Sequence, residues 1–102
     1  MLRFKMRVLV RAMVSATAGN KMVKDPNFMK NLEDYIHKFN CEAAYFFPLN
    51  GERTMVFVLD LPSQDMIPAV AEPLFHNYEA KVEVHPAMNL DDLKKGISNM
   101  QG

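Results

Sequence analysis

The sequence predicts a single α+β domain with the element order β-α-β-β-α-β and a short helix at the C-terminal end. Three observations support this fold class. Residues 2–13 alternate apolar and basic side chains with the period of a strand. Two later segments show apolar residues at helical spacing, and Asn50-Gly51 stands between two extended segments, as is typical of a tight hairpin.

Length and composition limit the class of protein. The 102 residues, 49% of them hydrophobic, suffice for one core, so we expect one domain spanning residues 1–102. The single Cys41 excludes an intrachain disulfide, and we expect a cytoplasmic location. No run approaches eighteen apolar residues, so we expect no membrane partner.

The net charge of zero hides a polarised chain. Residues 1–24 carry six basic and no acidic side chains, whereas residues 25–102 carry six basic and twelve acidic ones. A split β-α-β layout also occurs in RNA-recognition modules, but their aromatic signature is missing here and the overall charge is not basic. We therefore expect no nucleic-acid partner.

The first elements follow from local patterns. The arginine-rich start also resembles an organellar transit peptide, but its alternation and the Val8-Leu9-Val10 run favour a strand over Leu2–Met13. The small residues from Ser15 to Asn20 show no period and predict a loop. Asp25-Pro26 is a cap followed by a proline-friendly first turn, so we predict a helix from there to Asn40.

The second half is predicted in the same way. Strands are expected at Cys41–Pro48, Arg53–Leu61 and Ala80–His85, and the middle one is apolar on both faces. Ser63 or Asp65 caps a helix that reaches Tyr78, and Pro73 predicts a kink or an irregular second half. Asn89 and Asp92 cap the terminal helix, which Gly96 is expected to end.

In this ferredoxin-like topology the first and third strands are central, the fourth lies beside the first, and both helices cover one face of a four-stranded antiparallel sheet. The other face would then expose the apolar side of Arg53–Leu61 and the aromatic side of Cys41–Pro48. That is more apolar surface than a monomer should show, so we expect a homodimer through the sheet face.

Several segments carry a family resemblance: Glu42-Ala43-Ala44-Tyr45-Phe46, Gly51-Glu52-Arg53-Thr54, Ala71-Glu72-Pro73-Leu74-Phe75, and the run from Val82 to Met88, together with Gly19-Asn20 and Lys24-Asp25. With these the chain resembles a family of small uncharacterised bacterial proteins. That family is similar in turn to the dimeric α/β-barrel superfamily, which includes small monooxygenases and muconolactone-isomerase-like enzymes. The resemblance implies a dimeric barrel and assigns no reaction.

The candidate site combines the first and last strands. Arg7 or Arg11 would bind an anionic group, His85 is the weak candidate for an acid or base, and Tyr45 or Phe47 would form the apolar wall. The alternative is that these charges are ordinary cross-strand pairs with Lys81 and Glu83. Asn20, with its neighbouring lysines, is a candidate lid residue, or else part of a plain turn.

No cofactor or metal is expected. The three histidines and Cys41 lack the spacing of a metal site, and Cys41 is expected to be a packed small hydrophobe. Two functions remain open. One is a homodimer that binds a small, partly apolar, anionic organic molecule, with isomerase- or monooxygenase-like chemistry. The other is a non-catalytic interaction protein that uses its sheet face only for dimerisation.

Overall fold

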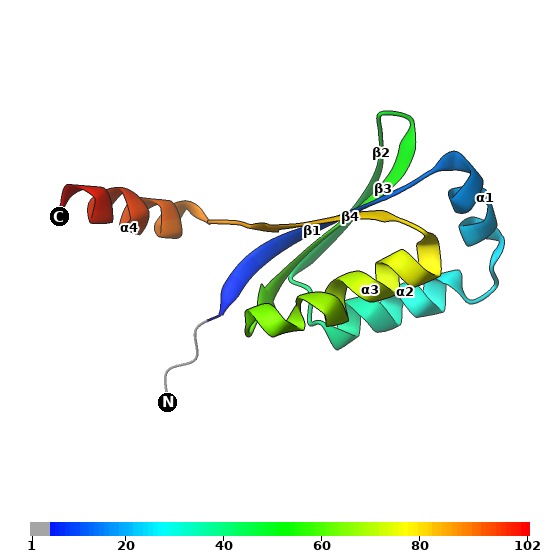
Figure 1. The fold of residues 1–102 in the computed structure, drawn as a ribbon, viewed down its shortest axis with the longest axis horizontal. Helices are drawn as coiled ribbons and strands as arrows, with labels where there is room; N and C mark the ends of the chain where they lie inside the picture. The colour runs from blue at the N-terminus through cyan, green and yellow to red at the C-terminus, as the bar shows by residue number, and fades with distance from the viewer. Residues whose placement is uncertain (1–4) are drawn as a thin grey trace.

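A computed structural model describes residues 5–102, which form four strands and four α-helices (Figure 1). In chain order these are β1 (Met6–Val14), α1 (Ala16–Lys24), α2 (Phe28–Lys38), β2 (Ala43–Leu49), β3 (Glu52–Leu61), α3 (Ile67–Tyr78), β4 (Lys81–Pro86) and α4 (Leu90–Gln101). A short 3₁₀ turn, Gln64–Met66, precedes α3. Leu2, Arg3 and Phe4 of the expected first strand lie outside the described residues.

The four strands form one antiparallel sheet in the order β2-β3-β1-β4. The first and third strands are therefore central, as expected. Helices α2 and α3 lie side by side below the sheet in Figure 1, and the other side of the sheet carries no helix. We call that other side the open face. The sheet of this single chain does not close into a barrel.

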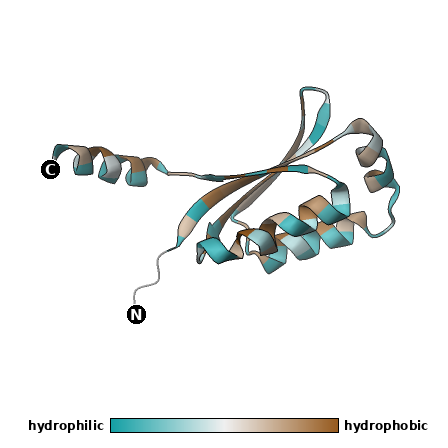
Figure 2. Ribbon diagram, in the orientation of Figure 1, coloured by the Kyte–Doolittle hydropathy of each residue, from teal (hydrophilic) through white to brown (hydrophobic). Residues whose placement is uncertain are grey.

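The core lies between the sheet and the two helices. Alternate residues of β1 and β3 point toward α2 and α3 and are almost fully buried, because strand side chains alternate between faces. Figure 2 shows the matching apolar stripes on the helices. The main core residues are Val8, Val10, Ala12, Val14, Met55, Phe57, Leu59, Leu61, Leu32, Tyr35, Val70 and Leu74.

The loop expected at Ser15–Asn20 is wrong, because this segment belongs to α1. Ser15 caps the helix by accepting a hydrogen bond from the Ala18 amide at 3.2 Å. Ala18, Gly19 and Met22 are buried on one side of it. Tertiary packing and the serine cap therefore override the weak local pattern of small residues.

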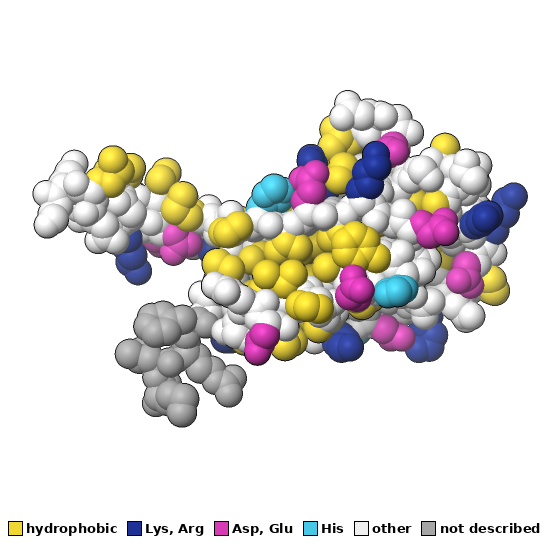
Figure 3. Space-filling view, in the orientation of Figure 1, with side chains coloured by type: hydrophobic (Ala, Val, Ile, Leu, Met, Phe, Trp, Pro, Cys, Tyr) yellow, Lys and Arg dark blue, Asp and Glu magenta, His cyan; other side chains and the backbone are white. Residues whose placement is uncertain are grey.

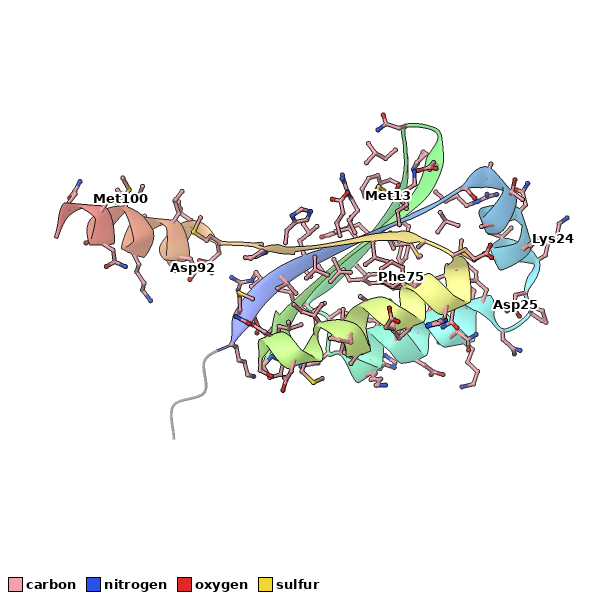
Figure 4. All side chains as sticks on the ribbon, viewed as in Figure 1. Met13, Lys24, Asp25, Phe75, Asp92 and Met100 are labelled. Carbon is pink, nitrogen blue, oxygen red and sulfur yellow. The ribbon has the colours of Figure 1, made fainter. Side chains whose placement is uncertain are left out.

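The predicted start of the next helix is also wrong. Asp25 ends α1, and its carboxylate accepts a hydrogen bond from the Asn27 amide at 2.9 Å. The Asp25-Pro26-Asn27 segment is thus a turn between two helices, and α2 begins at Phe28. Figure 4 marks this junction with Lys24 and Asp25. The aspartate and proline signals were real, but they belong to a turn and not to a helix start.

The hairpin prediction is confirmed. Asn50 and Gly51 have φ angles of 52° and 76°, the left-handed backbone that a two-residue hairpin turn requires. The flanking strands run Ala43–Leu49 and Glu52–Leu61, and the last strand runs Lys81–Pro86, each within two residues of expectation.

The irregular second half expected for α3 and the expected end of α4 at Gly96 are both wrong. Helix α3 runs without a break through Pro73 to Tyr78, where the buried Leu74 and Tyr78 hold its second half against the core. Helix α4 continues past Gly96 to Gln101, since a helical glycine costs only about 1 kcal/mol relative to alanine. Its expected start is confirmed by a capping box between Asn89 and Asp92.

Candidate functional site

The strand register arranges the open face as a grid of cross-strand rows. Three rows cross all four strands in the order β2, β3, β1, β4, and the pairing of β1 with β3 adds a partial fourth, Asp60-Arg7. The three complete rows are Phe47-Thr54-Met13-Lys81, Tyr45-Val56-Arg11-Glu83 and Ala43-Val58-Leu9-His85. The middle of the face is therefore mainly apolar, and its charges lie toward β4 and at the end near Arg7.

Arg11, Glu83 and His85 form one charged cluster on this face. Arg11 Nη2 lies 2.9 Å from both carboxylate oxygens of Glu83, and His85 Nε2 lies 2.8 Å from Glu83 Oε1. The hydrogen bond from His85, followed by that from Arg11, lowers the pKa of the Glu83 carboxyl below its ordinary value. Arg11 Nε is buried and has no hydrogen-bond partner among residues 5–102.

An open hollow of about 440 Å³ lies beside this cluster. Its walls are Leu9, Arg11, Glu83, His85, Pro86 and Ala87. The hollow therefore combines a guanidinium, a carboxylate and an imidazole with apolar side chains. Such a mixture of an apolar wall and a few polar groups is typical of a small-molecule site.

Arg7 belongs to a second, separate cluster. Its Nε lies 2.7 Å from Glu42 Oε1, and its Nη1 lies 3.1 Å from Asp92 Oδ2. The hydrogen bond to Glu42 is the main reason why the pKa of Arg7 is raised. The same Asp92 oxygen accepts the Asn89 amide at 3.1 Å, so Arg7 fixes the first turn of α4. Figure 4 shows Asp92 where α4 leaves the sheet.

The two arginines therefore do not share one site. They are four residues apart on a strand, which separates them by about 13 Å. Tyr45 lies in the same row as Arg11 but two strands away, a separation of about 10 Å. Of the residues expected to bind a ligand, Arg11 and His85 alone line the hollow on the open face.

Asn20 lies at another place, and Phe47 lies in the open-face row of Met13, outside the hollow. Asn20 Oδ1 accepts a hydrogen bond from Arg53 Nη2 at 3.2 Å, which fixes helix α1 to the hairpin. Because Asn20 is helical and held in this way, it is not part of a loop over the hollow. Phe47 lines an apolar groove of about 370 Å³ between α1, α2 and the hairpin. We call this the hairpin groove, and its walls include Met22, Met29, Leu32, Phe46, Phe47 and Pro48.

Sequence reasoning missed Glu42 and Asp92 as partners of Arg7, and Arg53 as the partner of Asn20. Arg11 and Glu83 were recoverable, because the expected pairing of the first and last strands already placed opposite charges side by side. Of the two partners of Arg7, Glu42 lies directly before β2 and Asp92 lies in the capping box of α4. No periodic sequence pattern indicates that these two positions lie near Arg7.

In residues 5–102 no three His, Cys, Asp or Glu side chains are grouped so that they could hold a metal ion. Within the same residues, no helix combines the length and the apolar character needed to cross a membrane.

Comparisons with known proteins support the fold alone. No family model matches the sequence, and no curated protein matches it. Among solved structures, the fold is similar to that of the uncharacterised protein TM1266 from Thermotoga maritima, with a TM-score of 0.53 and 15% sequence identity. The similarity covers 83% of this chain and 100% of that chain. The four-stranded sheet with its helices is thus a known arrangement.

Proposed function

We propose that the protein is a ferredoxin-like homodimer that binds a small, partly apolar organic anion at the Arg11–Glu83–His85 hollow. The observation that carries the binding proposal is the hollow itself, in which a guanidinium and an imidazole stand beside apolar walls. A second copy stacked on the open face would cover the hollow and exclude water from it.

The apolar middle of the open face supports the dimer. Val56 at its centre is only 9% exposed, Val58, Leu9 and Met13 around it are half-buried, and Tyr45 at its margin is 63% exposed. No helix covers these side chains in the single chain. Stacking two such faces would bury them together, as in the dimeric barrels that the sequence resembles.

The donors of the charged cluster support an anionic ligand. Both hydrogen bonds to Glu83 come from Arg11 Nη2, so the Nη1 donors of the same guanidinium are not used in this pair. The carboxylate also orients the exposed His85 ring. A ligand could thus place its carboxylate against Arg11 while His85 exchanges a proton with another part of the same ligand. This arrangement suits isomerase-like proton transfer.

The alternative is a non-catalytic interaction protein, and one observation favours it. The arginines of the open face already face carboxylates of the same chain: Glu83 for Arg11, and Glu42 with Asp92 for Arg7. If these pairs are the whole role of the charges, the open face serves assembly alone.

Sedimentation velocity tests the dimer. At micromolar concentration the protein should sediment at about twice 11.7 kDa. Val58→Lys places a charge in the middle of the open face and should give a folded monomer, whereas Asn31→Lys on the exposed side of α2 should stay dimeric. A monomeric wild-type protein contradicts the dimer.

Thermal shift with benzoate, salicylate and hexanoate tests the binding site. A ligand that binds only the folded state raises the melting temperature by mass action. Arg11→Ala should remove this shift, and Lys38→Ala, a charge removal on α2, should keep it. If none of the carboxylates raises the melting temperature, or if Arg11→Ala shifts equally, the alternative function holds.

A further inference from the structure

The hairpin groove is an apolar recess on the helix side of the sheet, at the β2 edge. Phe46 of β2 and Met55 of β3 are cross-strand partners, and Met55 points to the same side as the core residue Phe57, because strand side chains alternate between faces. The floor residues are at most 8% exposed and the wall residues 49% to 60% exposed; they are Met22, Leu32 and Met55 for the floor, and Val23, Met29 and Phe46 for the walls. A second copy stacked on the open face would leave this groove accessible.

The lining of the groove suits an alkyl chain. Its volume of about 370 Å³ falls within the range of small-molecule sites, which is roughly 300–1,000 Å³. Met22, Met29 and Met55 contribute flexible thioether side chains that adapt to the shape of a bound chain. The hydroxyl of Thr54, which also lines the groove, already donates to the Glu52 carbonyl at 3.2 Å. The floor and walls therefore leave few polar atoms for a polar ligand to bind.

Arg53 places a positive charge at this apolar groove. Among the lining residues that the structure describes, Arg53 alone is charged. Its Nη2 donates to Asn20 Oδ1 at 3.2 Å, and the missing side chain of Gly19 leaves room for the guanidinium. Because the Asn20 amide is neutral, this contact positions the cation without neutralising it.

The other two arginines of the sheet are compensated by carboxylates. Arg7 and Arg11 form ion pairs at 2.7 to 3.1 Å, and Figure 3 shows side chains of both charges close together along the upper side of the sheet. Within residues 5–102, Arg53 forms no such ion pair, and its cross-strand partners Val14 and Pro48 are uncharged. A guanidinium in this state can bind a carboxylate through two parallel hydrogen bonds.

We propose that the hairpin groove binds an unbranched medium-chain fatty acid, with the carboxylate on Arg53 and the alkyl chain against the methionines. This site lies on the side of the sheet opposite the Arg11–Glu83–His85 hollow, and the inference does not rest on the function proposed for that hollow. Because burial of the chain supplies most of the affinity, each added methylene should strengthen binding about two- to fourfold until the groove is filled.

Isothermal titration calorimetry with hexanoate, octanoate and decanoate tests the chain, and 1-octanol tests the charge. The affinity should rise along the three acids, and decanoate should bind at least tenfold more tightly than hexanoate. Arg53→Gln should weaken octanoate at least tenfold and leave 1-octanol unchanged, since the alcohol carries no charge. Equal losses for both ligands would mean that Arg53 only supports the groove, and the proposed carboxylate contact would be wrong.

A matched pair of substitutions on α2 tests the position of the chain. Met29→Asp puts a carboxylate into the groove wall and should abolish decanoate binding. Asn31→Asp puts the same group at an exposed position outside the lining and should keep it. Both positions are exposed, so both variants should keep the wild-type melting temperature without ligand. Unchanged decanoate binding in Met29→Asp contradicts this site.

Arg11→Ala separates the groove from the hollow. Decanoate should bind Arg11→Ala as tightly as the wild-type protein. If decanoate binding is lost in Arg11→Ala and kept in Arg53→Gln, the acid binds in the hollow, so this inference is wrong and the function proposed for the hollow stands. If no alkanoate binds the wild-type protein, the inference is also wrong, whatever benzoate does at the hollow. A change of mass in sedimentation for Met29→Asp would then identify the groove as a contact between copies.

Discussion

Arg11 and Glu83 face each other across the β1–β4 pairing, with one guanidinium nitrogen 2.9 Å from each carboxylate oxygen. His85, two residues farther along β4, completes a line of three charged or titratable groups. Glu83 therefore holds both of the residues that the proposed ligand would contact, and its ionisation controls their positions.

The lowered pKa of Glu83 predicts how stability depends on pH. A carboxylate whose pKa falls on folding stabilises the native state above its unfolded pKa of about 4.3, and this contribution is lost as the pH falls through the lower folded value. Glu83→Gln should thus be less stable than the wild-type protein at neutral pH. The difference should begin to shrink as the pH falls below about 4.3 and disappear once the pH is below the lowered pKa of the folded state, as followed by urea titrations. An equal difference at every pH would contradict this ion-pair origin.

Tyr35 connects the two core helices by a buried hydrogen bond. Its hydroxyl donates to the Val70 carbonyl at 2.8 Å, and burial raises the pKa of this phenol. Tyr35→Phe should lower the free energy of unfolding by about 1 kcal/mol, because the ring packing is kept and one hydrogen bond is lost. Chemical denaturation measures this, and Tyr45→Phe at an exposed position serves as the control with no expected change.

The missing side chain of Gly19 leaves room for the side chain of Arg53. A Cβ at position 19 would lie 2.5 Å from Arg53 Nη1 and 3.0 Å from Arg53 Cδ. Gly19→Ala should therefore displace the guanidinium and break its bond to Asn20, which offsets the gain in helix propensity. In an Arg53→Ala background the same substitution should instead stabilise the protein by about 0.8–1 kcal/mol in thermal or urea unfolding. If Gly19→Ala does not stabilise the Arg53→Ala protein, the clash at position 19 is not with Arg53.

Cys41 should react slowly with alkylating agents. Partial burial raises the pKa of its thiol, and the thiolate is the reactive form. At about pH 8 the native protein should consume iodoacetamide several-fold more slowly than the urea-unfolded chain, followed by mass spectrometry. Equal rates in the two states would contradict the burial of this thiol.

The sequence predicted the sheet well because strand signals are local and periodic. The alternation of β1 and the Asn50-Gly51 turn each restrict the backbone without help from distant residues. Helix α1 was missed because its stability comes from packing the buried Gly19 and Met22 against the rest of the protein. A local sequence pattern cannot show such packing. The full length of α4 was missed because the prediction took Gly96 as the end of the helix. The apolar stripe that continues at Ile97 was the stronger signal.

The candidate site was predicted only in part for a related reason. The side of each strand on which Arg11 and His85 lie follows from the period of two, and so does their nearness across neighbouring strands. The distance between Arg7 and Arg11 follows from strand geometry too, but the capture of Arg7 by Glu42 and Asp92 depends on how a strand entrance and a helix cap meet in space.

The central place of β1 sets an order of events during synthesis. It is the earliest of the four strands in the chain, yet its neighbours come late: β3 is the second strand of the hairpin, and β4 follows α3. At ribosomal speed the emerging strand stays unpaired for several seconds, with its arginines uncompensated. Glu42, Glu83 and Asp92 are synthesised later, in that order. Glu42 and Asp92 then pair with Arg7, and Glu83 pairs with Arg11. The basic residues of β1 are thus synthesised before the acidic residues that pair with them. Strand β1 can therefore form hydrogen bonds along both of its edges only after β4 has been made.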